Sequence, residues 1–191
     1  MKRLILMITV IIAFMATNIV TVTEPEIKKE PKPEPKIIEV IEPENVRTYF
    51  DVPLSEELQN YIFDTCEQYE IDPAIVVAVI WRESRYNADS IGDNGNSFGL
   101  MQIQKKWHVK RMENLGGKDL LNPYDNVLVG IDILAEKLKN YGNIGQALTA
   151  YNCGDTGARK NYFSKGIAMN NYAKEVLAKT EEIKNEKNKI N

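Results

Sequence analysis

Residues 71–103 constrain the fold more than any other stretch, because a wholly apolar helix runs directly into a polar loop: IDPAIVVAVIWRESRYNADSIGDNGNSFGLMQI. Asp72 followed by Pro73 is typical of a helix N-cap and a first helical position. Residues 74–81 are apolar on every side of the helix, so we expect the helix to be buried rather than amphipathic. The sequence therefore predicts a globular domain packed around this helix.

An acidic residue, Glu83, stands where the apolar helix ends. A carboxyl group at a helix C-terminus faces the negative end of the helix dipole, and burial further disfavours its ionised form. Both effects raise its pKa, as a general acid working near neutral pH requires. Residues 89–98 are rich in Asp, Asn, Ser and Gly and predict a loop that lines a cleft beside this acid. The alternative is a surface carboxylate paired with Arg82 or Arg85.

Four short motifs occur in order within residues 58–182: Glu83-Ser84, Gly99-Leu100-Met101-Gln102-Ile103, Ala150-Tyr151-Asn152 followed by Gly154, and Tyr172 within Asn-Tyr-Ala-Lys-Glu-Val. In this order and at these spacings they resemble the lytic transglycosylase domain of the soluble-transglycosylase type, which is related to goose-type lysozyme. Each motif alone is weak, since a Glu-Ser pair is common by chance. Four motifs in register form a specific pattern.

The resemblance implies a mostly α, lysozyme-like single globular domain that cleaves peptidoglycan glycan strands, with Glu83 as the catalytic acid. The residues that it places at the substrate, with the apolar ones as cleft wall, are Ser84, Ser97, Gly99, Leu100, Met101, Gln102, Ile103, Tyr151, Asn152 and Tyr172. The Tyr172 phenol would hydrogen-bond the Glu83 carboxyl group. We expect no metal and no organic cofactor, since the loop at residues 89–96 lacks the closing glutamate of a calcium-binding loop.

Residue chemistry leaves alternatives open at these positions. Ser84 could be the fraying end of its helix, and Gln102 could face solvent. Tyr151 and Asn152 also fit a core aromatic followed by an asparagine C-cap. At Tyr172 a core tyrosine is the close competitor. The resemblance, and not the spacing alone, favours the functional interpretation of these five positions.

Glycoside cleavage normally uses two carboxyl groups, whereas this sequence makes only Glu83 obvious. In the family that it resembles, one is enough: the substrate N-acetyl group assists, and the glutamate acts first as acid and then as base. The muramic C6 hydroxyl closes on C1, which leaves a 1,6-anhydro end. Asp89 and Asp93 are the candidates for a second carboxylate, and we expect them to serve the loop. The alternatives are a goose-lysozyme-like hydrolase and a peptidoglycan-binding protein without catalysis.

Composition limits the other possibilities. The net charge of -3 and the pI of about 5.4 argue against nucleic acid as a partner. A single histidine, His108, argues against a His-rich metal site and a Ser-His-Asp triad. Cys66 and Cys153 cannot form the disulfide framework of a small secreted domain. One bridge between them stays open, because export would place them in an oxidising compartment.

Residues 1–23 have a short basic start followed by an apolar run, which predicts export. The sequence around Ala16 lacks a full Ala-x-Ala cleavage pattern, which favours an uncleaved membrane anchor over a signal peptide. Residues 24–48 alternate Pro, Glu and Lys and predict a linker, either a semi-rigid stalk or a disordered spacer. We therefore expect a domain exported and anchored in the cytoplasmic membrane facing the cell wall, or secreted if the segment is cleaved. Secretion or conjugation machinery is a further candidate partner.

The globular domain is predicted over residues 49–185, with a fraying tail at 186–191. Hydrophobic periodicity and capping residues predict further helices in order along the chain at residues 55–69, 104–115, 122–142, 144–151 and 168–183. A glycine-bearing loop is expected at residues 154–157. Strand-like alternation of useful length is absent from the sequence, so the domain is predicted to be mostly α.

Overall fold

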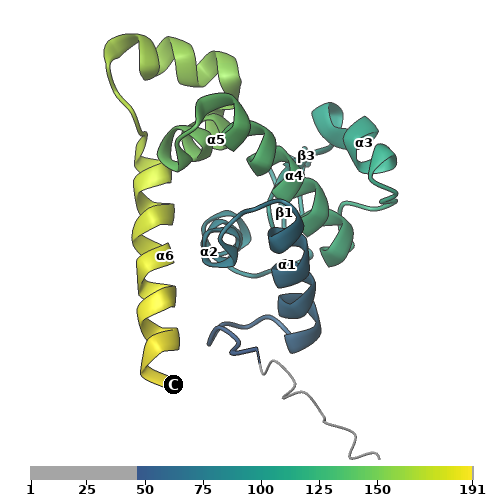
Figure 1. Ribbon diagram of the computed structural model, residues 1–191. Helices are drawn as coiled ribbons and strands as arrows, with labels where there is room; N and C mark the ends of the chain where they lie inside the picture. The colour runs from purple at the N-terminus through teal and green to yellow at the C-terminus, as the bar shows by residue number, and fades with distance from the viewer. Residues whose placement is uncertain (1–46, 191) are drawn as a thin grey trace, which may run out of the picture. The chain divides into compact units, whose positions relative to one another are not determined.

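The computed structural model describes residues 47–190, with side chains for residues 47–187. The predicted N-terminal segment and almost all of the linker lie outside these residues. The helices are α1 (Glu56–Gln68), α2 (Pro73–Ser84), α3 (Lys105–Asn114), α4 (Pro123–Tyr141), α5 (Ile144–Asn161) and α6 (Asn171–Ile190), with a short 3-10 helix η1 (Phe163–Lys165) (Figure 1). The domain is mostly helical, as predicted.

Helix α2 lies at the centre of the domain, between α1 and α6 (Figure 1). Its start is fixed by Asp72, whose carboxylate accepts a hydrogen bond from the Ala74 backbone N–H at 2.9 Å, and by Pro73 in the first turn. Nearly all of its apolar side chains are buried. The prediction of a buried helix with this N-cap is confirmed.

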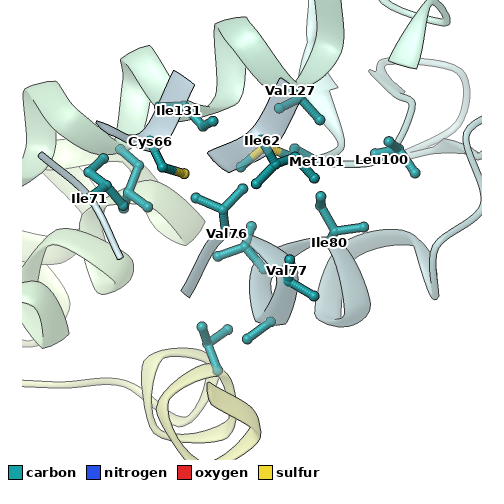
Figure 2. Close-up of a cluster of buried hydrophobic side chains, with 14 of the residues drawn as sticks. Ile62, Cys66, Ile71, Val76, Val77, Ile80, Leu100, Met101, Val127 and Ile131 are labelled. Carbon is teal, nitrogen blue, oxygen red and sulfur yellow. The ribbon is translucent and has the colours of Figure 1, made fainter. Parts of the chain in front are cut away.

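The core forms where α2 meets α1, α4 and the segment before α3. Figure 2 shows Val76, Val77 and Ile80 of α2 facing side chains from these other elements. The labelled partners are Ile62, Cys66, Ile71, Leu100, Met101, Val127 and Ile131. Burial of apolar side chains at about 25 cal/mol per Å² makes this cluster the main source of stability. It also fixes the end of α2, and hence Glu83, against the rest of the domain.

The polar segment after α2 folds into a small antiparallel sheet rather than a loop alone. Strands β1 (Ile91–Gly92), β2 (Ser97–Phe98) and β3 (Ile103–Gln104) lie in the order β1-β2-β3, with Ile91 opposite Phe98 and Phe98 opposite Ile103. Each strand has two residues, which is too short for alternation of polar and apolar side chains to be visible in the sequence. For that reason these strands were not predictable from the sequence.

Two predicted boundaries at the end of the chain were wrong. The predicted loop at residues 154–157 is part of α5, which kinks at Gly154, where φ is 70° and ψ is 163°, and then continues to Asn161. Only glycine adopts this backbone conformation at little cost, so the kink replaces the expected loop. Helix α6 begins at Asn171, three positions later than the predicted 168, and extends to Ile190, beyond the predicted helix end at 183.

Cys66 and Cys153 are both free thiols, so the bridge that the sequence left open is not formed. Cys66 is buried in the core beside α2, and its burial raises the pKa of the thiol to about 12. The Cys153 thiol donates to the Thr149 carbonyl oxygen at 3.1 Å. The Cys66 side chain therefore serves packing in the core, whereas Cys153 is only partly buried.

Over residues 47–190, every helix is too short or too polar to cross a membrane. Within the same part of the chain, His, Cys, Asp and Glu side chains form no group of three or more that could hold a metal ion.

Candidate active site

A cleft of about 940 Å³ crosses the domain, with walls from the end of α2, the small sheet, α3, α4 and α5. Six of the predicted site residues line it: Glu83, Ser97, Gln102, Ile103, Tyr151 and Asn152. The other five predicted residues are buried and do not line the cleft: Ser84, Gly99, Leu100, Met101 and Tyr172. The fold thus brings residues from three distant segments of the sequence to one cleft.

Glu83 reaches the cleft from the last turn of α2, half-buried. Burial raises the pKa of its carboxyl group above the ordinary 4.5, and the charge of Asp93 acts in the same direction. A hydrogen bond from Tyr172 and the charge of Arg82 oppose this rise without cancelling it. The sequence predicted a raised pKa, and burial is its main cause.

The two arginines beside Glu83 have other partners. Arg82 donates from Nε to Glu175 on α6 at 2.7 Å. Arg85 lies over the Trp81 ring, 4.0 Å from its centroid. The alternative of a surface carboxylate paired with either arginine is therefore not what the structure shows. Glu83 has the partly desolvated setting of a functional acid instead.

Two tyrosines surround the acid from α5 and α6. The Tyr172 phenol, on a buried side chain, donates to Glu83 Oε1 at 2.6 Å, the hydrogen bond that the sequence analysis expected. Tyr151 donates to the Met101 carbonyl oxygen at 2.9 Å and lines the cleft. Burial, followed by the Glu83 charge, raises the pKa of both phenols well above 10.0. Both therefore stay protonated donors at neutral pH.

The segment from Gly99 to Ile103 supports the cleft mainly through its backbone. Leu100 and Met101 are buried in the core and do not form cleft wall. Gly99 has a φ of +73°, and a Cβ there would lie 2.6 Å from the Leu120 carbonyl oxygen. A side chain does not fit at this position, which explains the glycine.

Gln102 lies beside the small sheet and lines the cleft. Its amide nitrogen donates to the carbonyl oxygens of Ser90 at 3.1 Å and Gly99 at 2.9 Å. These two bonds hold the amide in one orientation, so the interpretation of Gln102 as a solvent-facing side chain does not hold. Ser97 donates to Asp93 at 2.5 Å in the same wall. Polar groups on this wall are thus held in place before any ligand arrives.

Ser84 is placed differently from the expectation. Its side chain is buried, and its hydroxyl donates to the Ile80 carbonyl oxygen at 3.1 Å, so the group serves the last turn of α2. Asn152 does line the cleft, and its side-chain oxygen accepts from Asn170 at 2.9 Å.

Sequence reasoning missed two asparagines that organise the site. Asn170 holds Asn152 and also accepts from the Ala173 backbone N–H at 2.9 Å, which caps the start of α6. An asparagine just before a helical segment is an N-cap signal, so this residue was detectable. Asn126 lies on α4 and holds the Gly99 segment. Nothing in the local pattern of α4 distinguishes it.

Tyr172→Phe tests the contact between the phenol and the acid. Removing the donated hydrogen bond takes away an interaction that favours the ionised carboxylate, so the pKa of Glu83 rises further. We expect the alkaline limb of the activity profile to move to higher pH, with turnover about tenfold lower because the carboxyl group is less firmly oriented. The measurement is a pH–rate profile, with Tyr49→Phe as the control at a distant phenol. Lower stability with an unmoved limb would show that Tyr172 is structural only.

The geometry defines a mostly helical domain whose cleft holds a partly buried glutamic acid, Glu83, with a raised pKa. Its fold is similar to that of the lytic transglycosylase Slt from Pseudomonas aeruginosa, solved as an inactive mutant. The TM-score is 0.54 at 18% identity, over 67% of this chain and 24% of that one. Residues 60–173, more than half of the chain, match the family described as "Transglycosylase SLT domain". The chain belongs to this family, as the motifs predicted.

Individual relatives fall into bacterial proteins and lysozymes. The chain is 36% identical over 92 residues to "X polypeptide" of Escherichia coli, covering 45% of this chain and 54% of that protein. It is 34% identical over 101 residues to "Invasion protein IagB" of Salmonella typhimurium, covering 50% and 62%. It is 30% identical over 118 residues to "Lysozyme g" of Casuarius casuarius, covering 58% and 64%. The chain therefore spans between half and two thirds of these relatives.

Proposed function

We propose that this protein is a peptidoglycan lytic transglycosylase that cleaves the β-1,4 bond between N-acetylmuramic acid and N-acetylglucosamine. The observation that carries the proposal is Glu83, partly buried in the cleft, with a raised pKa and a hydrogen bond from Tyr172. A raised pKa increases the fraction of the carboxyl group that is protonated, and the protonated form can donate a proton to a glycosidic oxygen. Family membership supports the same activity.

In the proposed reaction Glu83 acts twice. It first protonates the leaving oxygen of N-acetylglucosamine while the N-acetyl group of the muramic residue assists departure. The ionised carboxylate then takes the proton of the muramic C6 hydroxyl, and that oxygen bonds to C1. The carboxyl group returns to its protonated form, and the product has a 1,6-anhydro end without consuming water. The proton lost in the first step is recovered in the second, so one carboxyl group suffices.

The substrate contacts that we propose are those of the cleft wall. Ser97, Gln102, Ile103, Tyr151 and Asn152 line the cleft and would bind the sugars directly. Gly99, Leu100, Met101 and Tyr172 would act from behind them, by holding the backbone and the acid. Cleavage of a cell-wall polymer implies that the domain works outside the cytoplasm, although the predicted anchor lies outside the described residues.

A muramidase that uses water is the second candidate, and Asp93 is the observation that favours it. Asp93 lines the cleft and its charge raises the pKa of Glu83, whereas Asp89 lies outside the cleft lining among the described residues. An inverting or retaining glycosidase needs a second carboxylate near the bond. Asp93, however, accepts hydrogen bonds from Ser97 at 2.5 Å and Gln104 at 3.3 Å, which supports its role in the loop.

Mass spectrometry of products from purified peptidoglycan decides between these activities. We expect anhydro-muropeptides, which lack one water relative to hydrolysis products. Reducing-end products would instead establish a hydrolase, and Asp93→Asn would then be expected to abolish it. Binding without either product would leave the domain as a peptidoglycan-binding protein and overturn the proposed activity.

A further inference from the structure

The cleft does not end at the acid but continues into a second groove of about 510 Å³ along α3 and α4. Three residues line both the cleft and the second groove: Trp107, His108 and Lys137. A polymer that lies in the cleft can therefore continue into the second groove. Helix α3, which carries Trp107 and His108, lies at the edge of the domain, where it packs against α4 and β3 (Figure 1).

Trp107 is the largest of the exposed apolar side chains, with 67% of its surface accessible. The Lys106 ammonium group lies over the ring, 4.7 Å from its centroid, and restrains its orientation. A single exposed aromatic is common on protein surfaces and needs no explanation by itself. Its position at the junction of the cleft and the second groove, in the first turn of α3, is what distinguishes it.

The second groove presents charges that are already paired with one another. Arg111 pairs with Asp132 and Glu136, and Lys137 pairs with Glu136 at 3.0 Å and with Asp155 at 2.9 Å. An ionic ligand such as a peptide would have to compete with these bridges. A neutral ligand would not.

His108 adds a polar group suited to a neutral ligand. Burial, followed by the charges of Arg111 and Lys137, lowers the pKa of its imidazole below 6.5. The ring is therefore uncharged at neutral pH and can donate from one nitrogen and accept at the other. Sugar hydroxyl groups are partners of this kind.

We propose that Trp107 is a stacking platform for one pyranose ring of the glycan strand, beyond the sugars held at Glu83. This inference rests on the proposed function and extends it to chain length. The apolar C–H face of a pyranose packs on the flat indole, while its hydroxyl groups reach His108. Large aromatic side chains bury a large area on contact and supply much of the contact energy at binding sites. Long strands should therefore bind more tightly than short ones.

The test measures binding of peptidoglycan fragments, a tetrasaccharide and an octasaccharide, to the full chain carrying Glu83→Gln, so that turnover does not interfere. Adding Trp107→Ala is expected to weaken octasaccharide binding about five- to tenfold and to leave tetrasaccharide binding unchanged. Trp107→Phe, which keeps an aromatic face, should lose less. Tyr124→Ala is the matched control, because this aromatic is also exposed, at 39%, and lines neither the cleft nor the second groove.

The outcomes separate the two proposals. If the Glu83→Gln protein binds neither fragment, the proposed function itself is wrong. If it binds both equally, or if Trp107→Ala leaves octasaccharide binding unchanged, the platform is overturned while the function stands. An equal loss for both fragments would place Trp107 at the inner sugars and would also overturn an outer platform.

Discussion

Replacing Glu83 by Gln is expected to reduce peptidoglycan cleavage by about 10³-fold or more while the protein stays folded. General acid catalysis by a positioned group contributes ~10²–10⁴-fold, and here the same carboxyl group is proposed to act in both steps. The amide has nearly the same shape and can still accept the hydrogen bond from Tyr172, which lies at 2.6 Å in the native protein. The measurement is release of soluble muropeptides from purified cell walls.

The stability of Glu83→Gln distinguishes a loss of catalysis from a loss of folding. The pKa of Glu83 is raised in the folded state, so the folded protein binds more protons than the unfolded chain above pH 4.5. Stability therefore falls as the pH rises from 4.5 through the folded pKa. Glu83→Gln removes this fall. We expect it to be at least as stable as the native protein at neutral pH, measured by urea unfolding, with the advantage shrinking in acid.

Glu67→Gln provides the matched control, since it makes the same change at an exposed position on α1. It should keep full activity and the native stability at neutral pH, because substitutions at exposed positions usually change stability little. Substantial activity in Glu83→Gln would exclude this carboxyl group as the acid. Asp93, the carboxylate whose charge raises the Glu83 pKa, would then become the first residue to test.

The parts of this fold that were predictable from sequence depend on local chemistry. Asp72 with Pro73 and Asn122 with Pro123 mark the starts of α2 and α4, because an N-cap side chain bonds backbone groups only two or three residues away. The burial of α2 followed from its composition. Glu83 was predicted as the acid from its place at the end of this helix together with the three motifs that follow it in the chain, and its raised pKa follows from the burial that the apolar helix implies.

The parts that were missed depend on distant contacts. The kink at Gly154 is indistinguishable in sequence from a helix end followed by a loop, because glycine serves both. Ser84 lies next to the acid in the chain, yet a helix turns adjacent side chains about 100° apart, and its hydroxyl bonds Ile80 instead. Trp107 and His108 carry no family motif, and only the packing of α3 places them on the cleft.

Asn126 shows most clearly how a distant contact builds the site. Its side chain is fully buried on α4, and it spans three backbone groups. The amide oxygen accepts from the Met101 N–H at 2.8 Å, and the amide nitrogen donates to the carbonyl oxygens of Phe98 at 2.8 Å and Leu120 at 2.7 Å. The turn that presents Met101 to Tyr151 is therefore held by one side chain from another part of the sequence.

Asn126→Ala is accordingly expected to destabilise the domain by about 3 kcal/mol or more, since each buried backbone group left without a partner costs roughly 1–3 kcal/mol. Asn122→Ala, four residues earlier on the same helix, removes an exposed N-cap that accepts from the Tyr124 and Asp125 N–H groups, and should cost only about 1 kcal/mol. Urea unfolding compares the two variants.

Activity measured on the folded fraction separates an effect on the cleft from an effect on stability. Without Asn126 the Met101 carbonyl oxygen loses its fixed position, and with it the 2.9 Å contact that orients Tyr151 in the cleft. We expect Asn126→Ala to lose activity beyond its unfolded fraction, whereas Asn122→Ala should lose none. Equal stability of the two variants would mean that water replaces the Asn126 amide as the hydrogen-bond partner of the Gly99–Met101 turn. The cleft would then depend less on α4 than the contacts indicate.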